Sequence, residues 1–338
     1  MAIITKPLTI EDLPAPPPDR SGWPWTEQPE MLSQPLLNSA EWPLISIITP
    51  SYNYGRFIEE TIRSVLLQAY PNLEYIIIDG GSTDETVSII KKYEKYLTYW
   101  VSEPDKGQTD AINKGYERCT GDIFVWLNAD DAYATPNCLQ SVAEFYRQGY
   151  KLISGEFCPV DLNGNEIIEY RDFGKSYPVS FYQYLKFWVC RHLPQPAVFV
   201  ATELADKCFP LDVNLQVVMD YQFFLRVLSL KPKVISLNQN WVNFKYHGKN
   251  KCLGNLSEDF NELSEISHVA LSEASKLPWV LRKFFEIDTG DYKIIHSLIC
   301  STKGLTFERF LFPLISRPTL ARWPIFWKSF AKYLINQI

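Results

Sequence analysis

The chain has 338 residues, of which 46% are hydrophobic and 21% charged, and its formal net charge is -6. This composition is typical of a folded globular protein with one large domain, or with one domain and an appendage. The acidic balance argues against a nucleic-acid-binding protein, which would carry a basic surface. The seven cysteines include no C-x-x-C pair, so we expect free thiols in a reducing compartment rather than a disulfide framework.

The N-terminal arm, residues 1–43, differs from the rest of the chain because it is rich in proline and cannot continue a helix or a central strand. One interpretation is a disordered leader. Trp23 and Trp25 are costly to expose to water, so we expect the arm to lie along the main domain. The arm lacks the apolar core of a signal peptide, and no stretch reaches the roughly 18 apolar residues of a membrane span. A cytoplasmic protein is therefore expected.

From residue 44 onward, short apolar runs alternate with segments that have apolar residues at helical spacing. Ser82 and Glu85 also have the spacing of a capping box. Such alternation predicts an α/β protein with a mainly parallel sheet, covered by helices on both faces. Strands are predicted at 44–50, 73–79, 97–103 and 122–128, and helices within 57–68, 80–96 and 109–119.

Beyond Asp131 the pattern is less regular. We expect helices at 136–148 and 220–230, and strands at 151–155, 166–170, 196–201, 233–237 and 241–247.

The predicted domains are a catalytic domain at 44–248 and a mostly helical C-terminal region at 249–338. The last segment, 307–338, mixes large apolar residues with five basic ones. It is either a plain helical appendage or a basic amphipathic surface that lies on an anionic membrane.

Polar residues gather where the predicted strands end. Pro50, Asp79, the segment 103–106 and the pair Asp130 and Asp131 all follow such ends, and in parallel sheets ligands bind there. Carboxylates without soft ligands suit Mg²⁺ or Mn²⁺ that is shared with substrate phosphates. Two alternatives stay open: the acidic pair is a helix N-cap, or Asp79 belongs to a glycine turn before a capped helix.

Five segments occur in the order and spacing of family 2 glycosyltransferases: ISIITPSYN, YIIIDGGSTDET, SEPDKGQTDAINKG, GDIFVWLNADD and MDYQFFLR. From Leu44 to His247 the sequence resembles this family, which implies a Rossmann-like sheet of the GT-A type. The resemblance further implies metal-dependent, inverting transfer of a sugar from a nucleotide-diphosphate donor to an acceptor hydroxyl, in polysaccharide or glycoconjugate biosynthesis. The acceptor would be a saccharide or a lipid-linked saccharide, reached at the inner face of a membrane.

The resemblance also implies roles for single residues. Asn128 to Asp130 take the place of the DxD motif, with Asp130, Asp131 and His247 as metal ligands, although a lone His is more often a surface residue. Many family members have Asp in place of Asn128 and Gly80, which leaves the nucleotide open. Donor-binding roles are implied for Pro50, Ser51, Tyr52, Asn53, Asp79, Gly80, Ser82, Asp105, Lys106, Gly107 and Asn128.

Inverting transfer needs one carboxylate to accept the acceptor's proton. By the resemblance this base is Asp220, in the Met219-Asp220-Tyr221 triplet, and the alternative is an N-cap of the following helix. A catalytically inactive sugar-nucleotide binder or scaffold is the rival function. A nucleotidyltransferase would need a glycine-rich loop with a basic residue after the first strand. No such loop, no G-x-G-x-x-G and no P-loop follows it here.

Overall fold

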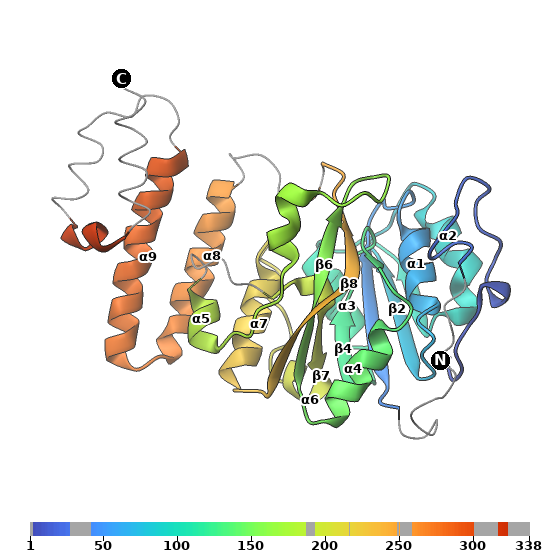
Figure 1. Cartoon of the computed structure of the whole chain (residues 1–338), viewed down its shortest axis with the longest axis horizontal. Helices are drawn as coiled ribbons and strands as arrows, with labels where there is room; N and C mark the ends of the chain where they lie inside the picture. Colours follow the sequence, from blue (N-terminus) through green and yellow to red (C-terminus); the bar gives the residue numbers. More distant parts are fainter. Residues whose placement is uncertain are drawn as a thin grey trace. The chain divides into compact units, whose positions relative to one another are not determined.

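The computed structural model describes residues 3–27, 42–186, 193–215, 217–248, 250, 259–300 and 317–323. It divides into two compact units, residues 1–184 with 191–251 and residues 185–190 with 252–338. The first unit contains the N-terminal arm and the sheet, and the second contains two long helices (Figure 1). The predicted division into arm, catalytic domain and C-terminal region stays a prediction.

A single eight-stranded sheet forms the centre of the first unit, with the strand order β3-β2-β1-β4-β7-β6-β8-β5. β1 pairs in parallel with β2 and β4, β2 with β3, and β6 with β8. β7 and β5 run antiparallel to their neighbours, so the mainly parallel sheet that was predicted is part of a mixed one. The strands are β1 Ile45–Ser51, β2 Leu73–Asp79, β3 Tyr99–Ser102, β4 Ile123–Trp126, β5 Ala132–Tyr133, β6 Leu152–Val160, β7 Val198–Ala201 and β8 Val234–Lys245.

The register of the first three strands aligns their polar ends. Ser51 of β1 pairs with Asp79 of β2, and Asp79 pairs with Ser102 of β3. Upstream of these residues β1 and β2 are buried throughout, because each strand carries an unbroken apolar run between two covered faces. The chain therefore turns polar at one edge of the sheet, where the strands end.

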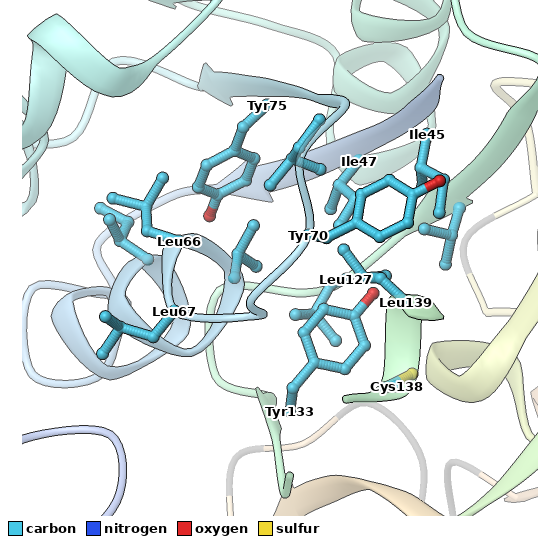
Figure 2. Packing of buried hydrophobic residues seen from close by; sticks show 14 of the residues in the cluster. Ile45, Ile47, Leu66, Leu67, Tyr70, Tyr75, Leu127, Tyr133, Cys138 and Leu139 are labelled. Carbon is cyan, nitrogen blue, oxygen red and sulfur yellow. The ribbon is translucent and has the colours of Figure 1, made fainter. Parts of the chain in front are cut away.

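Helices cover both faces of the sheet. On one face Ile45, Ile47 and Tyr75 pack with Leu66 of α1 and with Tyr133 (Figure 2). On the other face the rings of Phe124 and Trp126 in β4 contact aromatic residues of α7. The helices are α1 Ile58–Leu66, α2 Thr86–Tyr93, α3 Gln108–Tyr116, α4 Cys138–Arg147, α5 Phe181–Leu185, α6 Thr202–Ala205 and α7 Met219–Ser229.

Three local predictions were wrong. Most of the predicted strand at 166–170 instead belongs to a 3-10 helix, η4 Ile168–Gly174. An ion pair joins Arg171 of this helix to Glu166, which precedes it. The two strands predicted at 233–237 and 241–247 form the single strand β8. The capping box does not form, because α2 has Glu85 as its N-cap and the Ser82 hydroxyl donates to Asp79 instead.

The N-terminal arm lies along the sheet unit, as expected from its tryptophans. Ile4 forms a bridge with Leu73, with N–H···O distances of 2.9 and 3.1 Å, which adds the arm beside β2. Leu8, Leu13 and Trp25 are buried, and a short 3-10 helix, η1 Ile10–Asp12, lies between the two leucines. The interpretation of this segment as a disordered leader was therefore wrong for residues 3–27.

The second unit contains α8 Asp259–Glu273 and α9 Trp279–Cys300, which pack against each other. Asp291 of α9 is buried and accepts a hydrogen bond from the Thr319 hydroxyl at 2.9 Å, with the Arg317 guanidinium 3.3 Å away. The described helices include none that is long and apolar enough to cross a membrane. Most of the predicted basic surface at 307–338 lies outside the described residues. Cysteines 119, 138, 158 and 208 are free thiols, as expected.

Candidate functional site

The loops that follow β1 and β2 are hydrogen-bonded to each other. The Gly80 N–H donates to the Ser51 carbonyl at 2.8 Å, and the Asn53 N–H donates to the Ser82 hydroxyl at 2.7 Å. Asn53 has a φ of 56°, a left-handed conformation that asparagine tolerates, and its side-chain oxygen accepts the Thr83 N–H at 2.9 Å. The segments 50–53 and 80–83, which were both predicted to bind the donor, are thus joined by hydrogen bonds. We call these two segments together the lip.

Asp79 organises this lip. Its buried carboxylate accepts hydrogen bonds from the Gly81 N–H, from the N–H and hydroxyl of Ser82, and from the Ser102 hydroxyl. The interpretation of Asp79 as part of a glycine turn is therefore confirmed, because Gly81 has a φ of 85°. The turn that Asp79 holds lies beside exposed Tyr52, because it is hydrogen-bonded to Ser51 and Asn53 on either side of that residue.

Gly80 allows the loop after β3 to approach the loop after β2. A Cβ atom at Gly80 would lie 2.8 Å from Oδ2 of Asp105, so a side chain there would displace that carboxylate. Asp105 in turn accepts the Gly107 N–H at 2.7 Å, and Gly107, with a φ of 105°, leads into α3. The exposed Lys106 follows Asp105 in this loop. An Asp at position 80, as in many family members, would therefore require Asp105 to take another position.

The loop after β4 carries the two adjacent aspartates. Asn128 accepts a hydrogen bond from the Gln108 amide at 2.8 Å, which connects this loop to α3. The Asp131 N–H donates to the Asn128 carbonyl at 3.1 Å, so the chain turns sharply before β5. The alternative of a helix N-cap was wrong, because α4 begins at Cys138 with Asn137 as its N-cap.

The two carboxylates of this turn have different surroundings. Oδ2 of Asp130 lies 3.0 Å from Nε2 of His247, whereas Asp131 is fully buried. Burial, and then the charge of Asp130, raise the pKa of the Asp131 carboxyl well above its usual range, against the opposing effects of Asn128 and Lys245. Among the described residues, Oδ1 of Asp131 has no hydrogen-bond partner. Burial without a full set of partners therefore makes ionisation of this carboxyl less favourable than that of an exposed aspartate.

His247 is held in position by aromatic contacts. The ring of Phe57 stacks on the imidazole at 5.0 Å with an interplanar angle of 20°, and the ring of Tyr54 meets it edge-on at 6.2 Å. Burial, followed by the charges of Asp130 and Asp131, raises the pKa of the Tyr54 hydroxyl. The structure places His247 against Asp130, one of the two adjacent aspartates. Its function as a ligand stays a prediction.

The residues present fit a metal ion that is completed by substrate. No group of three or more His, Cys, Asp or Glu side chains is placed to hold a metal within the described ranges. Asp130 and His247 offer one carboxylate and one imidazole, with side-chain exposures of 10% and 7%. Mg²⁺ and Mn²⁺ commonly take one or two protein ligands and complete their shell with phosphate oxygens and water. The pair is therefore compatible with an ion shared with a diphosphate.

Asp220 lies in the first turn of α7, a helix that packs on the sheet. The rings of Phe223 and Phe224, one turn further on, contact Trp126, two residues before Asn128. Val218 is the N-cap of α7, and Asp220 Oδ1 accepts the N–H of Tyr221 at 2.7 Å, so the structure does not support the N-cap alternative. Burial raises the pKa of the Asp220 carboxyl to about 6, with backbone N–H groups opposing the shift. Such a pKa suits a general base near neutral pH.

Three contributors to this site were not singled out from the sequence. Gln108 holds Asn128, Phe57 stacks on His247, and Thr61 donates to the carbonyls of residues 129 and 131. Gln108 lies inside a quoted motif, so its polarity beside a glycine was an available signal. Phe57 is the N-cap of α1 and Thr61 lies within that helix, and nothing in their local pattern distinguishes them from core residues.

The comparison with protein families gives a match over the sheet. Residues 46–200 match the model described as glycosyl transferase family 2. An uncharacterized glycosyltransferase of Mycobacterium tuberculosis is 29% identical over 198 residues, which cover 57% of this chain and 72% of that protein. A Bacillus subtilis protein named as a teichuronic acid biosynthesis glycosyltransferase, TuaG, is 36% identical over 149 residues, 40% of this chain and 58% of that protein.

Solved structures share the fold. S. aureus TarS in complex with UDP has a TM-score of 0.56 and 18% identity, covering 80% of this chain and 78% of that one. A mannosyltransferase from Pyrobaculum calidifontis, in complex with GDP-Man and Mn²⁺, has a TM-score of 0.51 and 16% identity, covering 87% and 85%. At these identities the likeness shows the fold, which is the GT-A type that was expected.

Proposed function

We propose that this chain, whose residues 46–200 match the model of glycosyl transferase family 2, transfers a sugar from a nucleotide-diphosphate donor to an acceptor hydroxyl with inversion. The observation that carries the proposal is the convergence of four strand-end loops on one polar edge. There the Gly80 N–H binds Ser51, Gln108 binds Asn128, and Asp130 meets His247. This edge brings carboxylates, a side-chain amide and an imidazole together at the ends of the strands, where we propose that the donor binds.

The donor would lie along this edge. We propose that the lip formed by segments 50–53 and 80–83 borders the base and ribose, with Asp105 and Asn128 toward the sugar end. TarS has been solved with UDP and the mannosyltransferase with GDP-Man, so a uridine or guanosine diphosphate sugar is the class we propose. When bound, a divalent cation would compensate the negative charge of the diphosphate.

Asp130 and His247 are the residues that would hold that cation. Asp131, which was predicted as a third ligand, faces inward, so we assign it to the support of the turn. An imidazole beside a carboxylate favours Mn²⁺ over Mg²⁺, because Mg²⁺ strongly prefers oxygen ligands.

The proton transfer falls to Asp220. Its carboxylate accepts the proton of the acceptor hydroxyl while the acceptor oxygen bonds to the anomeric carbon, and the nucleoside diphosphate leaves with the electrons of the broken bond. A carboxyl pKa of about 6 keeps this base ionised at neutral pH. The relation to TuaG supports an acceptor from polysaccharide or glycoconjugate assembly, a saccharide or lipid-linked saccharide.

A screen of nucleotide sugars by thermal shift, with Mn²⁺ or with EDTA, tests this proposal. A uridine or guanosine diphosphate sugar is expected to raise the melting temperature only with the ion, and Asp130→Ala is expected to abolish that rise. Equal stabilisation in EDTA, or unchanged metal dependence in Asp130→Ala, would contradict the assignment. Release of free sugar from the stabilising donor in Mn²⁺ separates an enzyme from an inactive sugar-nucleotide binder.

A further inference from the structure

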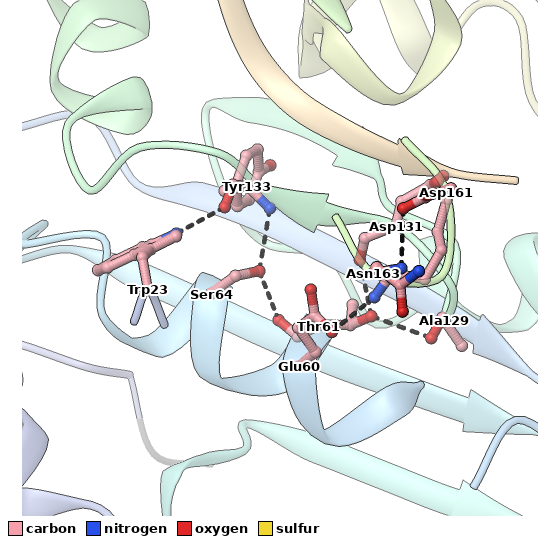
Figure 3. Close-up of polar contacts among 10 residues, drawn as sticks. Trp23, Glu60, Thr61, Ser64, Ala129, Asp131, Tyr133, Asp161 and Asn163 are labelled. Atoms are coloured by element: carbon pink, nitrogen blue, oxygen red, sulfur yellow. Dashed lines mark hydrogen bonds and ion pairs between the residues drawn. The ribbon is translucent and has the colours of Figure 1, made fainter. Parts of the chain in front are cut away.

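The backbone of Tyr133, three residues after Asp130, is held at its N–H and at its carbonyl (Figure 3). The indole N–H of Trp23, in the N-terminal arm, donates to the Tyr133 carbonyl at 2.8 Å. The Tyr133 N–H donates to the Ser64 hydroxyl of α1 at 3.0 Å, and that hydroxyl donates to the Thr61 carbonyl at 2.8 Å. The arm and α1 therefore meet on the strand that follows the acidic turn.

Thr61 of α1 holds the acidic turn itself. Its hydroxyl lies 3.0 Å from the carbonyl of Ala129 and 2.6 Å from the carbonyl of Asp131, so it can donate to both (Figure 3). These two carbonyls flank Asp130 in the chain. A shift of α1 relative to the sheet would consequently carry the Asp130 carboxylate with it.

α1 is in turn fastened to the arm by Arg63. This side chain is fully buried, and its guanidinium donates to the carbonyls of Pro14 at 2.8 Å, Pro24 at 3.1 Å and Trp25 at 3.0 Å. The ring of Trp25 also lies 5.5 Å from the guanidinium carbon. A buried charge is tolerated only where hydrogen bonds replace its hydration, and the arm supplies three of them here.

We propose that the N-terminal arm, residues 3–27, is a working part of the metal site: through Trp23 and Arg63 it fixes α1 and the loop of residues 129–133, and so sets the position of Asp130 beside His247. Trp23, Thr61, Arg63 and Ser64 are positioning residues, which act on the cation through the backbone of that loop. The consequence for metal binding rests on the proposed function, whereas the coupling between arm and loop does not.

The test compares Trp23→Phe with Trp25→Phe in the full chain. The first substitution removes the indole donor to the loop and keeps an aromatic ring; the second keeps a ring over Arg63 and leaves the loop contact intact. Hydrogen exchange of the amides of residues 129–133, measured without ligand, is expected to become about 3- to 10-fold faster in Trp23→Phe, the usual weight of one hydrogen bond. In Trp25→Phe it is expected to stay at the wild-type rate.

The second readout is the Mn²⁺ concentration that gives half of the donor-dependent thermal shift. It is expected to rise about 3- to 10-fold in Trp23→Phe and to stay unchanged in Trp25→Phe. A purely structural role would lower the melting temperature without moving this concentration. Ser64→Ala is expected to act in the same direction, and the double variant less than additively, because both side chains hold the backbone of the same residue, Tyr133.

Wild-type exchange of the loop in Trp23→Phe overturns the proposal. Faster exchange with an unchanged Mn²⁺ midpoint overturns the claim that the arm positions Asp130. If the wild-type protein shows no Mn²⁺-dependent shift with any nucleotide sugar, the proposed function fails, and the exchange rates still decide whether the arm holds the loop.

Discussion

Nε2 of His247 lies 3.0 Å from Oδ2 of Asp130, although 117 positions separate the two residues. The pair forms because β8 passes beside β5, with Asn243 opposite Ala132, and then continues to His247. Phe57 stacks on the imidazole, and the backbone N–H of His247 donates to the side-chain oxygen of Asn250 at 2.9 Å, so the ring and the backbone of this residue each have a contact that holds them. The site is thus completed by a strand that follows most of the catalytic unit in sequence.

His247→Ala is expected to raise the Mn²⁺ concentration needed for donor binding by about 10- to 100-fold, since one of the two proposed protein ligands is lost. The measurement is donor-dependent thermal shift across a Mn²⁺ titration. His268→Ala, which removes an exposed imidazole from α8, is the matched control and should leave the midpoint unchanged. Equal midpoints in all three proteins would assign the His247–Asp130 contact to structure alone.

Asp131→Asn is expected to raise the melting temperature of the metal-free protein at pH 7. The folded-state pKa of this carboxyl lies above the ordinary 3.8, so ionisation destabilises the fold, and stability falls as the pH rises from 3.8 through the folded-state pKa. The amide resembles the neutral acid, so the advantage of the variant should vanish as the pH is lowered toward 3.8.

The control for this pH series is Asp161→Asn. Hydrogen bonds from Asn165 and Asn163 lower the pKa of that exposed carboxyl, so its removal should not stabilise the fold at pH 7. If the melting temperature of Asp131→Asn stays at or below the wild-type value at every pH, the prediction is wrong, and the surrounding groups offset the cost of burying the Asp131 carboxylate.

Asp220→Asn is expected to lower the transfer rate by about 10²- to 10⁴-fold, the usual weight of a general base, while donor affinity persists. In the wild type, kcat/KM should rise with pH and level off above the Asp220 pKa of about 6, because only the ionised carboxylate accepts the proton. Asp212→Asn, which affects a carboxylate bonded within its own turn to Asn214, is the control. Wild-type transfer by a folded, donor-binding Asp220→Asn would place the base elsewhere.

Lys245→Met is expected to destabilise the protein by about 3 kcal/mol, because Nζ of this buried lysine lies 2.5 Å from Glu60 and its loss leaves that carboxylate unpaired. Denaturant unfolding measures the effect, and adding Glu60→Gln should restore much of the loss. Lys151→Met, which breaks the exposed pair with Glu203, should cost less than about 1 kcal/mol. Equal costs for the two lysines would contradict the importance of burial.

The sequence alone was enough for the first half of the sheet and for its polar edge. β1, β2 and β4 are continuous apolar runs, and Asp79 and Asp130 follow two of them, so both the strands and their ends can be recognised from neighbouring residues. The family motifs added Asp220, which the structure places in the first turn of α7. The predicted donor-binding residues at the ends of β1 and β2 proved to be hydrogen-bonded to one another.

The tertiary structure decided which carboxylate of the pair meets His247, and what holds it there. Two adjacent residues in a turn follow neither helical nor strand periodicity, so the sequence does not indicate which of them is buried. The packing of α1 and β8 shows that Asp131 is fully buried while Asp130 faces the imidazole. Ser82 likewise binds Asp79 instead of capping α2, and its hydroxyl also accepts the Asn53 N–H from the loop after β1. The arm contacts α1 through Arg63. The residues around Arg63 in the sequence are typical of any helix and do not indicate that its side chain is buried. The contacts of His247 with Asp130, of Asn53 with Ser82 and of Arg63 with the arm join segments far apart in the chain, and a contact of that kind leaves no pattern in the neighbouring residues.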